Sequence, residues 1–359
     1  MIPTVCMPYR TLLLVALTCA ASATSAGAQT FAIDSDLLFY GDNTEFTNPF
    51  RSGETIFGAS GRVMLDITFN DTVSVRGGFF GSGRFGSHEF LEHAEPVIAL
   101  ELRGGPSRLI FGSLETVAWQ HDVAGPDEET PHRLLPPIQR ETLTFTRGQE
   151  MGLQWLVASP RFDQDTWINW QRLNTAEARE RFDAGYRADV ALIPSLRFHG
   201  QWHIVHEGGQ QFDHGSVNDS HAVAAGLAWT VTTHGLRVTI DGHTVATRFV
   251  PDRERPSQTE AGLGVFTRGA VEHGLWRTHL IVWRSRDALK EEGDANYLAL
   301  GRDGVVLHKV RDYGEVGVTR RFAPAAGVDG FASFRLHRIE SHYEYSYRID
   351  CRVHLRWPF

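Results

Sequence analysis

The last part of the chain alternates strictly between apolar and polar residues. From Tyr343 to Phe359, every odd-numbered position carries an aromatic residue, an aliphatic residue or cysteine, and every even-numbered position between them is polar or proline. Successive side chains of a β-strand point to opposite faces. The pattern therefore predicts one long strand with an apolar face and a charged face.

The same period of two recurs along most of the sequence. The clearest further segments are 57–69, 182–192, 196–204 and 236–241, and weaker ones lie at 31–40, 73–83, 95–104, 107–114, 149–158, 165–173, 221–232, 259–269, 275–286, 296–309, 312–322 and 329–340. Residues that favour turns, such as Gly104-Gly105-Pro106, Gly235 and Gly274, separate several of them. Not every one of these seventeen segments needs to be a strand: we expect an all-β chain with sixteen strands, or fourteen if the first segment is periplasmic or a weak segment is a loop.

A soluble β-sandwich also alternates, but two features argue against it. Many of these segments exceed ten residues, whereas strands of soluble sheets usually have about five or six. Tyr347 and Trp357 bracket roughly 33 Å of the last strand, which at a tilt of about 40° spans the roughly 25 Å lipid-facing band between aromatic girdles. An arginine facing lipid at the midplane would cost about 2–4 kcal/mol, so the charged faces should line water. The pattern predicts a closed antiparallel transmembrane β-barrel.

The first residues have the pattern of an export signal. Arg10 precedes an apolar run at 11–20, and Ala26-Gly27-Ala28 offers a cleavage site. We expect residues 1–28 to be a signal peptide and residues 29–359 a single barrel domain. Cys351 is then the only remaining cysteine, which excludes an internal disulfide and a cysteine-based zinc site. The net charge of −8 argues against a nucleic-acid partner.

An export signal, long alternating strands and a terminal aromatic residue resemble bacterial outer-membrane β-barrels of the porin type. The resemblance implies a location in the cell outer membrane, in contact with its lipid. It also implies that Leu355, Trp357 and Phe359 belong to the signal read by the barrel-assembly machinery. Small polar solutes are the implied cargo. No cofactor and no metal ion are expected.

The charged faces supply candidate pore-lining residues. These are Arg62, Asp66, Arg76, Arg187, Arg197, His199, Gln201, His203, Arg237, Asp241, Arg277, Arg335, Arg348, Arg352 and Arg356. They could form a selective track for anions, or most of them could pair with acids as a salt-bridged wall. His199 and His203 share a face but lie roughly 13 Å apart on a strand, too far to chelate one ion.

The longest stretch without alternation is 115–148. It contains four acids that we consider as constriction residues, namely Asp122, Asp127, Glu128 and Glu129. A connection of this length is usually functional or disordered. Two interpretations remain open: the segment folds into the lumen as a constriction, or it is an ordinary extracellular loop.

The function expected from these features is an outer-membrane channel for small polar or anionic solutes, with saccharides among them. A structural or adhesin barrel that acts through its loops is the alternative, and a polysaccharide export pore with periplasmic partners is the third. Membrane barrel lipases share this architecture, but the sequence has no G-x-S-x-G motif, and its clearest outward faces hold almost no Ser–His pair. The sequence therefore predicts no catalytic residue and no enzyme activity.

Overall fold

The fold is an all-β chain with short helical turns. A computed structural model describes residues 29–120, 130–212, 215–305, 309–322, 325 and 327–359. The strands are β1 (Thr30–Glu45), β2 (Glu54–Thr68), β3 (Val73–Arg84), β4 (His93–Gly104), β5 (Ser107–Ser113), β6 (Met151–Ala158), β7 (Phe162–Arg172), β8 (Glu180–Ile193), β9 (Leu196–Gly208), β10 (Asn218–Thr233), β11 (Leu236–Val250), β12 (Glu260–His273), β13 (Trp276–Arg286), β14 (Val310–Arg321), β15 (Val328–Ile339) and β16 (His342–Pro358). The helical turns are η1 (Val117–Trp119), α2 (Leu143–Thr146), η3 (Pro256–Gln258) and η4 (Ala295–Tyr297).

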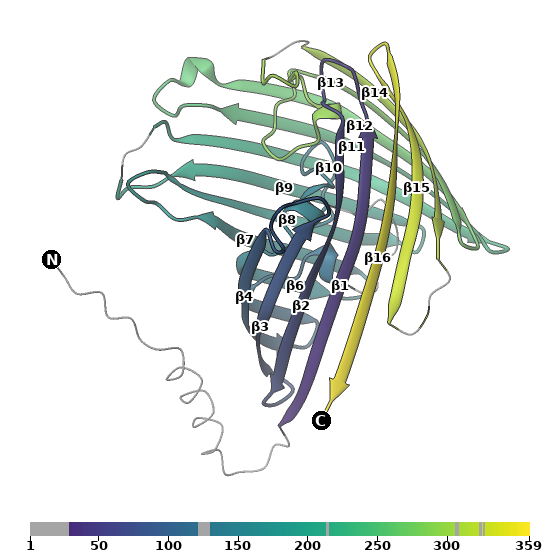
Figure 1. Cartoon of the computed structure of the whole chain (residues 1–359). Coiled ribbons are helices and arrows are strands. Elements are labelled where there is room, and N and C mark those ends of the chain that lie inside the picture. The colour runs from purple at the N-terminus through teal and green to yellow at the C-terminus, as the bar shows by residue number, and fades with distance from the viewer. Residues whose placement is uncertain (1–28, 121–129, 213–214, 306–308, 323–324, 326) are drawn as a thin grey trace.

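The sheet closes on itself. Each strand pairs antiparallel with its neighbours in sequence, and β1 pairs with β16, with Ala32 opposite Pro358 and Asp42 opposite Arg348. The amide of Phe359 donates to the carbonyl oxygen of Phe31 at 2.9 Å, which ties down the end of the seam. Figure 1 shows β1 and β16 side by side at this seam. The predicted closed barrel of sixteen strands is confirmed.

The two faces of the barrel wall differ in polarity, as the alternation predicts. On β16, Tyr345, Ile349 and Trp357 are 43%, 47% and 50% exposed, whereas the intervening Arg348 and Asp350 are buried. Within the described residues no second sheet covers the apolar face, because the sixteen strands there all belong to the one closed barrel. Such an exposed apolar band is stable against hydrocarbon, and the charged positions lie inside. In the described part of the chain, no helix is long and apolar enough to cross a membrane.

The two ends of the barrel differ in their connections. At one end the strands join through short turns such as 105–106, 194–195, 234–235 and 274–275. The start of β1 and the end of β16 also belong to this end, and Figure 1 shows these two points at its bottom. At His234 and Gly235 both φ angles are positive, at 49° and 78°, as a type I′ hairpin turn requires. The connections at the other end are longer, including 46–53, 114–150 and 287–309. We call these ends the short-turn end and the long-loop end.

The predicted alternating segment at 296–309 is not a strand in its described residues. Its first residues belong to η4 and to an irregular loop, in which Tyr297, Leu298 and Ala299 are buried. The indole of Trp283 on β13 donates to the carbonyl oxygen of Tyr297 at 2.9 Å. These apolar residues pack inside the barrel, so their apolar character reflects packing within the lumen and not strand alternation.

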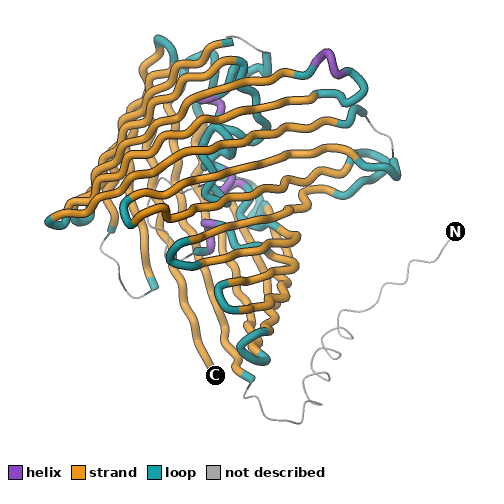
Figure 2. Tube along the Cα trace, turned by 180° about the vertical axis from the view of Figure 1, so that it is seen from behind, coloured by secondary structure: helices purple, strands orange, loops and turns teal. Residues whose placement is uncertain are grey.

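The described parts of segment 115–148 cross the interior of the barrel. The amide of Leu135 donates to Oε1 of Gln201 on β9 at 2.9 Å. On the opposite side, Arg352 of β16 donates to the carbonyl oxygen of Val117 at 2.9 Å. Figure 2 shows short helices within the outline of the barrel. The four acids Asp122, Asp127, Glu128 and Glu129 lie outside the described residues, so their predicted place at a constriction stays a prediction.

An apolar cluster joins the inward segments to the wall at the long-loop half. Phe46 and Phe50 come from 46–53, Leu134, Leu135 and Ile138 from 115–148, and Tyr297 from 287–309; they pack with wall residues that include Trp167, Phe266, Trp283, Tyr313 and Ile339. These side chains are nearly all inaccessible to solvent. The barrel thus encloses a packed core of loops at this level and does not leave the whole bore to water.

Candidate active site

A serine and a histidine meet on the inward face of three neighbouring strands. Glu315 on β14 lies directly opposite His337 on β15, and Ser346 on β16 lies opposite Arg335, two residues before His337. Side chains two positions apart on a strand share a face, so Ser346 and His337 are diagonal cross-strand neighbours. All of these side chains are buried inside the barrel.

Hydrogen bonds link Ser346 to Glu315 through His337. Ser346 Oγ lies 2.8 Å from His337 Nε2, and the hydroxyl of Tyr313 lies 2.8 Å from Nδ1. The Tyr313 hydroxyl donates to Oε2 of Glu315 at 2.5 Å, and the same carboxylate oxygen lies 3.4 Å from Nδ1. Because an ionised carboxylate only accepts, Tyr313 donates to it and its oxygen accepts from Nδ1–H. This assignment leaves Nε2 as the acceptor for the Ser346 hydroxyl.

The sequence of contacts from serine to histidine to carboxylate is the arrangement that activates a nucleophile. A serine hydroxyl is weak alone and becomes reactive when a neighbouring imidazole takes its proton, while a third group orients the ring. Here Ser346 is the nucleophile, His337 the base, and Glu315 the orienting acid with Tyr313 between them. His279 Nε2 lies 2.7 Å from the other oxygen of Glu315, which holds the carboxylate in place.

The Ser346 array borders a small enclosed cavity. Its volume is about 20 Å³, enough for about one water. Three guanidinium groups line it, those of Arg51, Arg335 and Arg348, together with Glu141 and Thr142 of segment 115–148. Glu141 accepts from Arg335 at 2.7 Å, and burial raises its pKa. The in-folded loops thus form the roof of the cavity, where the three guanidinium groups lie among the carboxyl groups of Asp42, Glu141, Asp294 and Glu315.

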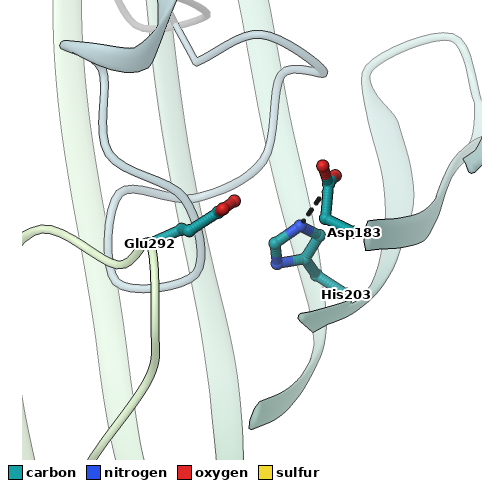
Figure 3. A group of neighbouring side chains, drawn as sticks. All are labelled: Asp183, His203 and Glu292. Atoms are coloured by element: carbon teal, nitrogen blue, oxygen red, sulfur yellow. Dashed lines mark hydrogen bonds and ion pairs between the residues drawn. The ribbon is translucent and has the colours of Figure 1, made fainter. Parts of the chain in front are cut away.

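A second cluster, Asp183, His203 and Glu292, has donor atoms within 4.8 Å of one another and could in principle hold a metal ion (Figure 3). Asp183 already accepts hydrogen bonds of 2.7–2.9 Å from the side chains of Trp167, Asn169 and Gln171. The guanidinium of Arg147 lies 3.3 Å from Asp183 and 2.5 Å from Glu292. A cation already bridges the two carboxylates, so the donor set does not fit a metal ion.

His132 of segment 115–148 is held on both sides. Its Nδ1 lies 2.8 Å from Asp165 of β7 and its Nε2 lies 2.8 Å from Glu150, while its ring stacks on Trp167 at 3.7 Å. Burial alone would lower the pKa of His132, but the two carboxylates outweigh it and raise the pKa to about 10. Neither nitrogen has a free lone pair, so this histidine is a cationic clamp and cannot act as a base.

The predicted pore-lining residues fall into three groups. Buried within the barrel are Arg62, Asp66, Arg187, Gln201, His203, Asp241, Arg277, Arg335 and Arg348. Partly buried are Arg76, Arg197, His199 and Arg352, and exposed at the short-turn rim are Arg237 and Arg356. The buried group therefore lies inside the barrel, whereas a role in conducting solutes stays a prediction for all of these residues.

Many of the predicted arginines form ion pairs. Arg62 lies 2.7 Å from Asp36, Arg76 lies 2.6 Å from Glu101, and Arg348 and Arg356 lie 2.5 Å and 2.8 Å from Asp42 and Asp34. Buried acids thus neutralise much of the arginine face. The arrangement favours the salt-bridged wall over a continuous track of free arginines.

Solved structures with similar folds are outer-membrane proteins. They include a loop L8 deletion mutant of OmpT from Vibrio cholerae, at 8% identity and a TM-score of 0.54, covering 92% of this chain and 100% of that one. OccK1 of Pseudomonas aeruginosa matches at 11% identity and a TM-score of 0.50, covering 91% and 99%. OccAB1 of Acinetobacter baumannii matches at 10% identity and 0.50, covering 94% and 99%. At these identities the likeness concerns the fold.

The closed wall, its apolar outer face and these similar folds define an outer-membrane β-barrel of the porin type. The sequence model of the Lipid A 3'-O-deacylase-type family matches residues 23–358, and the chain belongs to that family. No curated protein matches the chain significantly.

The prediction that the chain is not an enzyme is wrong, because its family is named for a deacylase activity. Ser–His pairs are almost lacking on the clearest outward faces. Ser346 and His337 lie instead on the charged inward face, which was assigned to pore lining. The signal was present in the sequence: both residues lie on the polar side of alternating segments that a short turn at 340–341 joins into a hairpin.

Proposed function

We propose that this protein is an outer-membrane ester hydrolase that removes an acyl chain from a lipid of the lipid A type. The family name supports the reaction class and the substrate. The observation that carries the proposal is the contact of 2.8 Å between Ser346 Oγ and His337 Nε2.

The reaction begins with attack of Ser346 Oγ on the carbonyl carbon of the acyl ester, while His337 Nε2 takes the hydroxyl proton. The resulting imidazolium is stabilised through Tyr313 by the carboxylate of Glu315. The C–O bond to the sugar then breaks, and His337 returns its proton to the leaving alkoxide. A water molecule repeats the sequence on the acyl-serine, releasing the fatty acid and restoring Ser346.

Two guanidinium groups near the reacting carbonyl support the same steps. Arg335 lies opposite Ser346 in the register, and Arg348 lies two residues further along the same face of β16. Both guanidinium groups line the cavity that Ser346 borders. Donors fixed where an oxyanion develops lower the barrier more than the same groups would in water.

The proposal is tested with Ser346→Ala and a fluorophosphonate probe, which labels activated serines covalently. The protein is refolded in detergent micelles and incubated with purified lipid A, and mass spectrometry follows the loss of acyl chains. Ser333→Ala is the matched control, since Ser333 is a buried inward serine on β15 whose hydroxyl has no hydrogen-bond partner among the described residues. We expect Ser346→Ala to lose both labelling and deacylation and Ser333→Ala to keep them. Deacylation that survives Ser346→Ala would refute the assigned nucleophile.

Passage of small polar or anionic solutes is a second candidate function. It is favoured by hollows of about 460 Å³ and 430 Å³ toward the short-turn end, lined in part by Arg108 and Arg187 and by Arg321 and Arg352. Planar-bilayer recordings in a salt gradient test it. Ohmic steps with anion preference, reduced by Arg187→Ala, would support it, and a correctly folded but silent barrel would refute it.

We also infer that the end of β16 guides assembly. Trp357 and Phe359 are 50% and 72% exposed, and they extend the apolar face of the last strand together with Leu355. Exposed terminal aromatics suit recognition by the barrel-assembly machinery. Removing Phe359 should lower the amount of folded, heat-modifiable barrel in outer-membrane fractions, whereas unchanged amounts would count against this inference.

A further inference from the structure

A large hollow opens at the long-loop end, next to the Ser346 cavity. Its volume is about 640 Å³, within the range of small-molecule sites, and it is formed by the inward segments 46–53, 115–148 and 287–309. Arg51, Thr142 and Asp294 line both this hollow and the Ser346 cavity. An ion pair of 3.0 Å joins Arg51 to Asp294. One layer of side chains therefore separates the hollow from the proposed nucleophile.

The hollow has more cationic than anionic groups left without ionic partners. Of its acids, Glu292 is held by Arg147 at 2.5 Å and Asp294 by Arg51, which leaves Glu54. Among the described residues, Arg140 and Arg302 form no ion pair, and both are exposed.

Lys290 is the third cation, and it is buried at the wall of the same hollow. Its ammonium group donates to the backbone oxygen of Glu291 at 2.7 Å and has no carboxylate partner in the described chain. Burial lowers the pKa of Lys290 to about 8. An anion bound in the hollow would offset that burial and favour the charged amine.

We propose that this hollow binds a phosphate-bearing headgroup through Arg140, Arg302 and Lys290, and so places an acyl ester of the same molecule beside Ser346. The planar fork of arginine suits phosphate oxygens, and the ammonium adds a point charge. Long loops of such barrels face the cell exterior, so the hollow faces the outer leaflet. The proposal rests on the proposed hydrolysis, because it names the part of the substrate that is held away from the ester.

Binding is measured without turnover, in the full chain carrying Ser346→Ala. The ligands are bis-phosphorylated lipid A, the same lipid after removal of both phosphates, and inorganic phosphate alone, each titrated against the refolded protein in detergent micelles. The test variant adds Arg140→Gln and Arg302→Gln. The matched control adds Arg161→Gln and Arg320→Gln, two exposed arginines at the short-turn end.

We expect the phosphorylated lipid to bind at least tenfold more tightly than the dephosphorylated lipid. The test variant should lose this preference, whereas the control should keep it, and inorganic phosphate should bind more weakly than the phosphorylated lipid. Equal affinity for the two lipids, or a test variant that keeps the preference, would overturn the proposal. Inorganic phosphate binding as tightly as the lipid would overturn the headgroup assignment, because the site would then serve free phosphate.

Failure of the hydrolysis itself gives a different result. If Ser346 of the unaltered chain takes no fluorophosphonate label while phosphate-dependent binding persists, the proposed reaction fails and the binding site stands. If Ser346 is labelled while phosphate has no influence on binding, only the headgroup site fails.

Discussion

The barrel buries two histidines under similar conditions but with opposite consequences. His132 and His337 are both inaccessible to solvent, both contact an aromatic ring, and both face carboxylates. His132 places a carboxylate on each nitrogen, whereas His337 has Tyr313 and Glu315 on one nitrogen and a hydroxyl, that of Ser346, on the other. Burial alone therefore does not distinguish a structural histidine from a reactive one. The group that contacts the second ring nitrogen distinguishes them: a carboxylate for His132 and a hydroxyl for His337.

The difference follows from where each residue lies in the chain. His337 is fixed by the register of three wall strands, so its partners come from rigid neighbours. His132 lies in a loop that must be tied to the wall, and two charged contacts supply that tie. Rigid strands can hold a reactive site in a fixed geometry, whereas a loop needs strong contacts to the wall to stay in place.

The sharpest test of the comparison replaces each histidine by glutamine. His337→Gln removes the base, so deacylation should fall by about 10³-fold or more, as for other members of such triads. His132→Gln should leave turnover per labelled Ser346 within a few fold. Initial rates with lipid A micelles, normalised to the fraction of protein that takes the fluorophosphonate label, measure both. Equal losses of deacylation in the two variants would show that the two histidines do not differ in their roles.

His132→Gln should instead lower stability. It leaves Glu150 and Asp165 facing each other without a cation between them, and breaking a buried ionic contact costs about 3–5 kcal/mol. The free energy of unfolding from urea titrations in micelles measures the loss. The matched control is His88→Gln, an exposed histidine in the β3–β4 loop. A loss no greater than that of the control would mean that the clamp contributes nothing to the fold.

Tyr313→Phe tests the link between His337 and Glu315. The hydroxyl accepts from one and donates to the other, and a hydrogen bond to a charged group contributes about 1.5–3 kcal/mol. We therefore expect kcat to fall roughly tenfold to hundredfold, with KM nearly unchanged. If KM rises while kcat holds, Tyr313 positions substrate and does not orient the base.

The sequence alone was sufficient for the wall but not for the interior. The alternation of β16 depends only on local side-chain direction, so its apolar face could be assigned from the sequence. The contact of Ser346 with His337 depends on the register between strands, which the alternation does not determine. Tyr297 was assigned to a strand at 296–309 because burial under a loop and burial in a sheet select the same apolar residues.

The choice between the two interpretations of segment 115–148 also needed coordinates. Its described part is held by long-range partners such as Gln201, Arg335 and Arg352, which no short-range pattern reveals. The arginines illustrate the same limit. Their inward direction could be predicted for most positions, but their pairing with acids such as Asp36 and Asp42 required the register of the seam.

The most specific prediction concerns the pH dependence of the His132 clamp. The pKa of His132 is about 10 in the folded barrel and about 6.5 in an unfolded chain. The stabilisation is therefore complete below pH 6.5 and declines as the pH rises toward 10, because the folded state then holds the proton that the unfolded state has released. Glu115 behaves in the opposite sense: burial opposes its charge, but Arg62 and Arg76 lower its pKa to about 2, so its contribution is lost only in strong acid.

Urea titrations of the parent and of His132→Gln at pH 6, 8 and 10 isolate the clamp. The difference in unfolding free energy between the two proteins should be largest at pH 6, smaller at pH 8 and nearly absent at pH 10. Groups that do not contact His132 titrate alike in both proteins, so their contributions cancel in this difference. A difference that stays constant from pH 6 to pH 10 would show that His132 is neutral in the barrel. The contrast with His337 would then rest on geometry alone and not on charge.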